Sequence, residues 1–350
     1  MQTKLDRKPH AEAVISGTLA AADIEKHFKK ALDRFVREVD LPGFRKGKAP
    51  AERIVEEVGK KSIWREAAEE ALKDSLVEVM AEHKVLPIVP PSISLTVGEA
   101  DTDVPFTVTI ITAPTVELKD FKKVGTDALA KLDKLDEEKE KGEARKSLDA
   151  QTRSMLQITE ERELTDDEAK QLGFENVAAM HLFLGEEAVH AVERYDEQRK
   201  RGAVADALTA AAKVEVPLVI IDDEARNMLE STKQNIARQG MPFNEYLDKR
   251  GLAEADIMTE LKPQAEKRVI LDLIFAHIAK EESLKPDDEE THRVAHALMH
   301  QGVPDQSAHQ YGAEVSLREQ VWALYGLAKP KPEPLKEVEA HDHSDPNHTH

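Results

Sequence analysis

Two short segments of alternating apolar and polar residues set the first limit on what this chain can fold into. SISLTV occupies residues 92–97 and FTVTII occupies 106–111, with the polar stretch GEADTD between them. A period of two places every second side chain on one face of a strand, and a polar stretch between two such segments marks a turn. The sequence therefore predicts a β-hairpin with one buried face, and residues 11–19 are a weaker strand candidate.

Helical spacing surrounds this hairpin in the first third of the chain. One apolar stripe belongs to a basic helix, and a second belongs to a helix for which Ser62 is the expected N-cap. The stripes consist of Ile24, Phe28, Leu32, Phe35 and Val39, and of Ala68, Leu72, Leu76 and Val79. Strands and helices in this order predict a small α+β domain over residues 1–118.

The second half of the chain has a helical pattern almost throughout. We expect one helix that is capped by Asp222 or Asp223 and that stops at Gly240. Further helices are expected over residues 243–249, 253–282 (with a kink or break at Pro263) and 314–327. The predicted fold is therefore multidomain and mostly helical, with an all-α domain at 163–328 and a disordered tail at 329–350.

Residues 119–162, between these domains, have a different composition. No aromatic residue and only two glycines occur within 122–162, and the charge run KLDKLDEEKEK occupies 131–141. A stretch of about 40 residues rarely folds alone without a disulfide or a metal. We expect a charged helical linker here, either one solvated helix or a helix pair.

Charge is distributed unevenly along the chain. The formal net charge is −19, yet residues 26–48 contain eight basic and three acidic residues, so this segment alone is net +5. A molecule with an acidic body and one basic tip presents only that tip to a polyanion.

Cysteine usage and hydropathy limit the remaining classes of protein. The chain has no cysteine, which excludes disulfide frameworks, thiolate metal sites and thiol nucleophiles. The first residues lack the apolar core of a signal peptide, and no window approaches the about 20 apolar residues that cross a bilayer. We expect a cytoplasmic protein without a membrane partner.

Residues 41–50, LPGFRKGKAP, are the most informative segment, and we call them the basic loop. Two glycines and two prolines oppose regular secondary structure. Arg45, Lys46 and Lys48 can contact phosphates, and Phe44 can stack on a base or enter an apolar pocket. A nucleotide-binding P-loop is excluded, because the glycines are separated by three residues instead of four and alanine follows the lysine where Ser or Thr is required. A solvated connection between two helices is the simpler interpretation.

The pattern Gly-Phe-Arg-x-Gly-x-x-Pro within the basic loop resembles the signature of the trigger factor family of ribosome-associated chaperones. EVPLVIIDDE at residues 215–224 resembles the entry into the C-terminal helical domain of that family, and QGM at 239–241 and AEKRV at 265–269 match its pattern. The resemblance covers residues 10–120 and 160–328.

This resemblance implies an ATP-independent chaperone with a ribosome-binding N-terminal domain and a substrate-binding C-terminal domain with extended helical arms. The loop would dock at the ribosomal exit tunnel, on a ribosomal protein and ribosomal RNA, while the arms shield unfolded or nascent polypeptides during folding and export. The positions carried over as ribosome-binding are Gly43, Phe44, Arg45, Lys46, Gly47, Lys48 and Pro50. No cofactor is expected, and a homodimer away from the ribosome stays open.

Four apolar residues in the C-terminal half are candidates for contact with client polypeptides. They are Met228, Leu229, Met241 and Phe243. Methionine is flexible and polarizable, and exposed apolar side chains often mark partner sites. The simpler interpretation is that each belongs to the core.

One feature departs from the family pattern. The family inserts a prolyl isomerase domain where this chain has only residues 122–162, and a segment without aromatic residues does not build an aromatic-lined proline pocket. We therefore expect no isomerase activity and no catalytic residue. The alternatives are a ribosome- or RNA-associated factor without chaperone action, and a residual prolyl isomerase.

Histidines form two groups that resemble metal sites. His292, His296 and His300 share one helix face, and four more histidines lie in the tail after residue 340. We expect a polar helix face and a solvated tail rather than metal sites, because no carboxylate is positioned beside the helical histidines. The sequence also lacks the HEXXH, Gly-x-Ser-x-Gly and Gly-x-Gly-x-x-Gly motifs.

Overall fold

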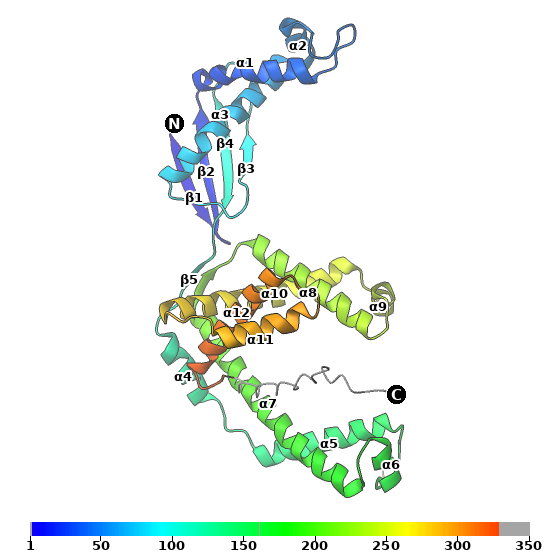
Figure 1. Cartoon of the computed structure of the whole chain (residues 1–350). Helices are drawn as coiled ribbons and strands as arrows, with labels where there is room; N and C mark the ends of the chain where they lie inside the picture. Colours follow the sequence, from blue (N-terminus) through cyan, green and yellow to red (C-terminus); the bar gives the residue numbers. More distant parts are fainter. Residues whose placement is uncertain (1, 161, 329–350) are drawn as a thin grey trace, which may run out of the picture. The chain divides into compact units, whose positions relative to one another are not determined.

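The structure is a computed structural model that describes residues 2–160 and 162–328 (Figure 1). Its backbone contacts divide the chain into two compact units. Unit 1 comprises Met1–Lys119 and Thr209–Ile274, and unit 2 comprises Asp120–Leu208 and the described part of Phe275–His350. The boundaries predicted at residues 118 and 162 stay predictions, and the predicted tail at 329–350 lies outside the described residues.

Unit 1 contains a four-stranded antiparallel sheet in the order β1-β2-β4-β3. The strands are β1 (Thr3–Lys8), β2 (Glu12–Leu19), β3 (Ser92–Leu95) and β4 (Val104–Ile111). Strands β3 and β4 form the predicted hairpin, and β2 confirms the weaker candidate. The edge strand β1 was not predicted, because in its sequence TKLDRK only Leu5 packs against the core.

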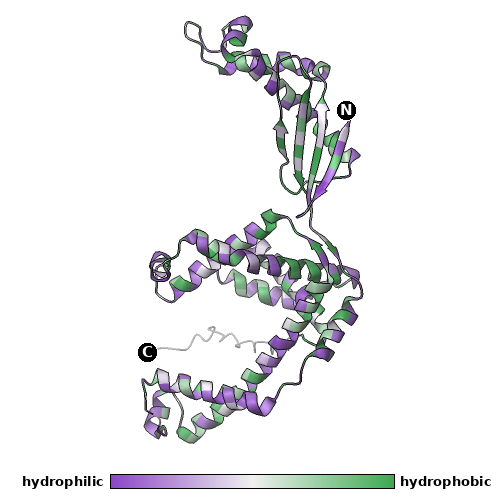
Figure 2. Cartoon of the chain, turned by 180° about the vertical axis from the view of Figure 1, so that it is seen from behind, coloured by the Kyte–Doolittle hydropathy of each residue, from purple (hydrophilic) through white to green (hydrophobic). Residues whose placement is uncertain are grey.

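Helices α1 (Ala21–Glu38) and α3 (Lys60–Glu82) pack with the sheet around one core, and α2 (Ala51–Val58) joins them. Alternate residues of β4 face this core, where Trp64 and Leu72 of α3 are almost fully buried. Figure 2 shows frequent hydrophilic residues along α1 and α2, in contrast to the hydrophobic residues within the sheet. The predicted N-cap at Ser62 is wrong: α3 starts at Lys60, because Gly59, with φ of 83°, lets the chain turn directly from α2 into α3.

The remainder of unit 1 begins with the pairing of β5 (Thr115–Glu117) and β6 (Lys213–Glu215). Helices α8 (Leu218–Arg238), α9 (Phe243–Arg250) and α10 (Glu254–Glu281) follow. The first turns of α8 pack against the middle of α10 through buried residues, namely Ile221, Ala225, Ala265 and Val269.

For these helices the predicted aspartate cap is wrong and the predicted helix ends are confirmed, while a kink at Pro263 stays a prediction. Helix α8 starts at Leu218 rather than after an aspartate cap, because Pro217 has the φ of −60° that leads into a helix. Helix α10 runs through Pro263 without a break. Gly240 and Gly251 follow α8 and α9 with positive φ angles of 79° and 64°, as the predicted helix ends require.

Unit 2 is helical throughout its described residues. Its helices are α4 (Phe121–Lys131), α5 (Glu137–Met155), α6 (Asp166–Gln171), α7 (Val177–Ala211), α11 (Asp288–Met299) and α12 (Asp305–Ala323), with the last part of α10. Helices α4 and α5 confirm the predicted helix pair. Helix α12 begins nine residues before the predicted start at Glu314, because Pro304 supplies its N-cap. None of the described helices is long and apolar enough to cross a bilayer.

Two side-chain clusters hold unit 2 together. Leu148 and Leu156 of the α5 region pack against Met180 and Leu184 of α7, so α5 has a packed face as well as a charged one. Arg201 of α7 forms an ion pair with Glu319 of α12 at 2.9 Å and lies 5.0 Å from the ring centre of Trp322.

Candidate functional site

The basic loop connects α1 to α2 as two consecutive tight turns. The backbone N–H of Phe44 donates to the Leu41 carbonyl at 3.1 Å, and that of Lys48 donates to the Arg45 carbonyl at 2.9 Å. The third residue of each turn is a glycine, with φ of 91° at Gly43 and 78° at Gly47. A positive φ at this position is typical of type II turns and favours glycine over every other residue. The local sequence therefore sets the shape of the loop.

Residues just after the turns anchor the loop to the domain. Ala49 is 6% exposed, and Ile54 in the first turns of α2 is fully buried. Val55 and Val58 of α2 pack against the core that the four-stranded sheet forms with α1 and α3. Pro50 is the N-cap residue of α2, with φ of −61°. The loop is therefore held at both ends by packed helices, while its middle residues face solvent.

The middle of the loop exposes one aromatic and three cationic side chains. Phe44 is 40% exposed although it is apolar, and Arg45, Lys46 and Lys48 are all exposed. An exposed phenylalanine between cations is suited to a partner that combines phosphates with bases or an apolar pocket. Sequence reasoning named this set of residues, and the structure brings them together on one loop; their function remains a prediction.

Three of the five cations of α1 have partners that the sequence did not indicate. Arg34 forms an ion pair with Glu66 of α3, and Lys30 lies 3.4 Å from Glu70 of the same helix. Lys26 is 2.7 Å from Asp23 within α1. These carboxylates pair three of the eight basic residues that the sequence places in 26–48.

The loop cations differ in this respect from Lys26, Lys30 and Arg34 of α1. Within the part of the chain that the structure describes, no carboxylate lies within 4 Å of the charged nitrogens of Arg45, Lys46 or Lys48. An exposed cation without a carboxylate partner loses no ion pair when it binds an external anion. Lys29 and Arg37 of α1 are also exposed and have no carboxylate within 4 Å among the described residues, so the unpaired basic tip consists of the three loop cations and these two helix cations.

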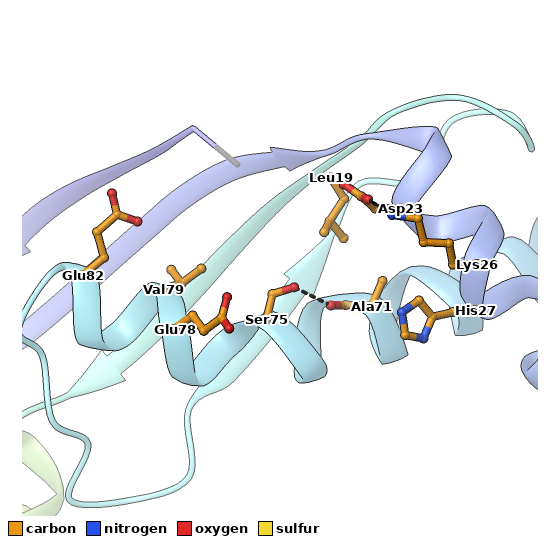
Figure 3. Close-up of a pocket in the computed structure, with 9 residues that line it drawn as sticks. All are labelled: Leu19, Asp23, Lys26, His27, Ala71, Ser75, Glu78, Val79 and Glu82. Atoms are coloured by element: carbon orange, nitrogen blue, oxygen red, sulfur yellow. Dashed lines mark hydrogen bonds and ion pairs between the residues drawn. The ribbon is translucent and has the colours of Figure 1, made fainter.

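A second candidate site is a groove of about 300 Å³ between α1 and α3 (Figure 3). Its lining consists of Leu19, Asp23, Lys26, His27, Ala71, Ser75, Glu78, Val79 and Glu82. The Ser75 hydroxyl donates back to the Ala71 carbonyl, and the hydrogen bond from Lys26 holds the pKa of Asp23 below its usual range. The Ser75 hydroxyl is thus engaged within its own helix, and Asp23 and Lys26 are paired with each other.

The four residues that the sequence suggested as client contacts are less exposed than that role requires. Leu229 is only 4% exposed, so a contact role for it is wrong, and Met228 packs partly against the core of Ile221, Ala225, Ala265 and Val269. Met241 and Phe243 are half-buried.

The most exposed apolar side chains of unit 2 lie on other helices. They are Met155, Leu182, Phe183, Val189, Tyr195 and Tyr311, with exposed fractions between 38% and 75%. For Leu182 and Phe183 the signal in the sequence is the run MHLFL at 180–184, since its four apolar residues spread over more of the helix circumference than one buried stripe covers.

The histidine stripe on α11 does not form a three-ligand site. Among the described residues, no group of three His, Cys, Asp or Glu side chains is arranged to hold a metal ion. His296 and His300 stack edge to face, with ring centres 4.4 Å apart, and His292 turns toward α12 instead.

Comparison with known proteins places both ends of the chain in one family. The family model described as "Bacterial trigger factor protein (TF)" matches residues 1–143, and the one described as "Bacterial trigger factor protein (TF) C-terminus" matches residues 176–323. Together they cover more than four fifths of the chain. The chain belongs to the trigger factor family.

Curated relatives agree over most of the chain. A trigger factor of Macrococcus caseolyticus is 22% identical, covering 82% of this chain and 88% of its own length. A trigger factor of Desulforamulus reducens is 23% identical, covering 77% of this chain and 82% of its own length. A solved structure of a trigger factor chaperone covers 94% of this chain at 15% identity with a TM-score of 0.48, a value too low to add weight to the fold.

The relatives are longer than this chain within the aligned region. The alignment with the Macrococcus protein spans 382 positions but covers 82% of this 350-residue chain, so roughly 95 positions of the relative have no counterpart here. Neither trigger factor model matches residues 144–175, between the two matched segments. The family pattern is therefore represented by its N- and C-terminal parts.

Proposed function

We propose that this member of a family of ribosome-associated chaperones docks at the ribosomal exit tunnel through the basic loop and shields nascent polypeptides without ATP. The observation that carries this proposal is the set of three exposed loop cations that have no carboxylate partner among the described residues, beside a 40% exposed phenylalanine, in a chain of net charge −19. The acidic remainder of the molecule is repelled by ribosomal RNA, so docking through this loop fixes the orientation of the chain.

Docking combines an electrostatic and an apolar contribution. Arg45 offers a planar guanidinium that can form bidentate contacts with a phosphate, whereas Lys46 and Lys48 act as point charges. Phe44 provides the apolar contact, on a splayed RNA base or in a pocket of a ribosomal protein. The two glycines keep the turns in the conformation that exposes these side chains together.

The exposed apolar side chains of unit 2 support this unit as the part that binds client polypeptides. Leu182, Phe183 and Val189 project from α7, and Met155 ends α5 with 75% of its surface exposed. Scattered apolar and methionine side chains bind many unfolded segments weakly, because they can adapt to different sequences. Release requires no nucleotide, since a folding client buries the same apolar surface in its own core.

We also propose that this chain is not a prolyl isomerase. Residues 122–160, as the structure describes them, form α4, α5 and connecting turns, and no strand or aromatic residue occurs among them. An isomerase pocket of the family's type needs a sheet and aromatic walls. An isomerisation rate of a proline peptide equal to the uncatalysed rate supports this proposal, and an accelerated rate that scales with protein concentration contradicts it.

The test of docking uses co-sedimentation of the full chain with purified ribosomes. The wild-type chain should pellet with ribosomes, and the combined substitution Phe44→Ala, Arg45→Ala and Lys46→Ala should remain in the supernatant with an unchanged circular dichroism spectrum. If the triple variant pellets like the wild type, the loop is not the docking site.

Salt dependence provides a second readout of the same proposal. If the three loop cations each displace one counterion from RNA, the affinity should fall roughly 15- to 60-fold between 50 and 200 mM salt. An affinity that does not change with salt contradicts an electrostatic docking step.

An aggregation assay distinguishes the proposed chaperone from its rival, a ribosome- or RNA-associated factor without chaperone action. The chain should suppress aggregation of a chemically unfolded protein in the absence of ATP and of ribosomes. Ribosome binding combined with no suppression favours the rival.

A further inference from the structure

Two histidines from different helices of unit 2 meet at one point on the α11–α12 pair. Nδ1 of His292 on α11 and Nε2 of His309 on α12 are 3.2 Å apart. The two rings are nearly perpendicular, with their centres 5.1 Å apart. His309 does not belong to the histidine stripe of the sequence, so this pair becomes visible only in the folded chain.

Small residues on α12 bring the two helices close enough for this contact. Ala308, Gly312 and Ser316 are buried at a spacing of four residues along α12. A Cβ atom at Gly312 would lie 2.5 Å from the carbonyl oxygen of Thr291, and the Asp287 N–H donates to the Ser316 hydroxyl at 2.8 Å. These contacts flank His292 and His309 and fix the distance between their backbones.

A carboxylate sets the proton position on His309. Its Nδ1 is 3.0 Å from Oδ1 of Asp305 and 3.1 Å from the Asp305 carbonyl oxygen. Both oxygens accept hydrogen bonds, so Nδ1 carries the hydrogen and Nε2 presents its lone pair toward His292. A carboxylate behind an imidazole is the usual arrangement at histidine metal ligands, where it fixes the tautomer and raises the basicity of the other nitrogen.

We propose that His292 Nδ1 and His309 Nε2 together bind one divalent transition metal ion of the Zn²⁺ type, with Asp305 as a positioning residue. Two nitrogens that each lie about 2.0–2.1 Å from a tetrahedral metal are about 3.3 Å apart, close to the separation found here. The metal takes the place of the hydrogen that the two rings share on Nδ1 of His292, and that hydrogen moves through solvent to Nε2 of the same ring.

Water completes the coordination of this ion. No third His, Cys, Asp or Glu side chain joins the pair among the described residues. His292 is exposed and the His309 side chain is 33% exposed, so solvent and the metal have direct access. Because one ligand comes from each helix, the bound ion ties α11 to α12. This site is independent of ribosome docking and goes beyond the proposed function.

The test measures Zn²⁺ binding by calorimetry on a full-length background that removes competition from the C-terminal histidines. The background carries glutamine in place of His341, His343, His348 and His350. We expect this background to bind one Zn²⁺ with Mg²⁺ present in excess, and His309→Gln or His292→Gln within it to abolish that binding with an unchanged circular dichroism spectrum. Asp305→Asn should weaken binding about 10- to 100-fold.

Matched controls separate this pair from other histidines. His190 lies 3.2 Å from the carboxylate of Glu193 without a second imidazole, so His190→Gln should leave Zn²⁺ binding unchanged. His296→Gln and His300→Gln should do the same. The proposal is overturned if the background does not bind Zn²⁺, if His309→Gln and His292→Gln both retain binding, or if the substitutions at His296 and His300 abolish it.

Discussion

Replacing Gly312 with alanine should destabilise unit 2 relative to the same replacement at Gly202. Both glycines lie in helices of unit 2, in α12 and α7, and alanine is the better helix former by about 1 kcal/mol. A Cβ at Gly202 meets no atom within 4 Å, whereas a Cβ at Gly312 lies 2.5 Å from the Thr291 carbonyl oxygen. The gain from helix propensity is therefore common to both variants, and only Gly312→Ala creates a clash.

The size of the effect follows from this contact. Carbon and carbonyl oxygen atoms approach to about 3.3–3.6 Å, so α11 and α12 must separate by roughly 0.8–1.1 Å to accept the methyl group. Overpacking of this kind costs about 1–3 kcal/mol. We expect Gly312→Ala to be less stable than Gly202→Ala by that amount, while Gly202→Ala itself gains about 0.5–1 kcal/mol over the wild type.

Urea unfolding followed by tryptophan fluorescence measures this difference in stability within unit 2. The chain has two tryptophans, so a Trp64→Phe background leaves Trp322 of α12 as the reporter. With a slope of about 2 kcal/mol per M urea, the two midpoints should differ by about 0.5–1.5 M. Equal midpoints, or a lower midpoint for Gly202→Ala, would refute the close approach of α11 and α12.

Three further predictions concern single groups. Burial raises the pKa of Tyr325 to about 12, so this tyrosine should ionise last of the four in alkali. The stability that its neutral form contributes should be lost as the pH rises from 10 to 12. An ultraviolet titration of Tyr325→Phe should lack this last ionisation. The hydrogen bond from Arg162 lowers the pKa of Glu168 to about 2. The stability that the ionised Glu168 contributes is therefore present above pH 4.5 and lost as the pH falls toward 2. The difference in thermal midpoint between the wild type and Glu168→Gln should shrink over that range. Alanine at Gly43 and Gly47 should weaken ribosome co-sedimentation, because the turns lose the positive φ angles that glycine supplies. Thermal stability should change little, because no atom lies within 4 Å of either new Cβ. A large drop in thermal stability would contradict a loop that is independent of the core.

The N-terminal fold was largely predictable, because one buried face of β3 and β4 leaves a period of two in the sequence. Strand β1 was not, since an edge strand with one packed side chain leaves almost no hydrophobic pattern. Helix starts at Lys60, Leu218 and Asp305 were missed because glycine and proline backbone geometry, rather than a polar side-chain cap, sets them.

The candidate site was predictable in its residues but not in its electrostatics. The loop residues are contiguous, so their turn chemistry and charge are readable directly. The ion pairs of Lys30 and Arg34 join residues that are more than thirty positions apart, and only the packing of α1 on α3 brings them together. The contact between His292 and His309 depends in the same way on the crossing of α11 and α12 at Gly312.

A comparison of two charge-matched double variants tests ribosome docking most directly. Arg45→Ala with Lys46→Ala removes two loop cations that have no carboxylate partner among the described residues, and Lys26→Ala with Lys30→Ala removes two cations that are already paired on α1. Both variants change the net charge equally, so non-specific attraction to RNA falls equally. The loop variant should lose co-sedimentation with ribosomes while the helix variant retains most of it; equal losses, or a larger loss in the helix variant, would contradict docking through the basic loop.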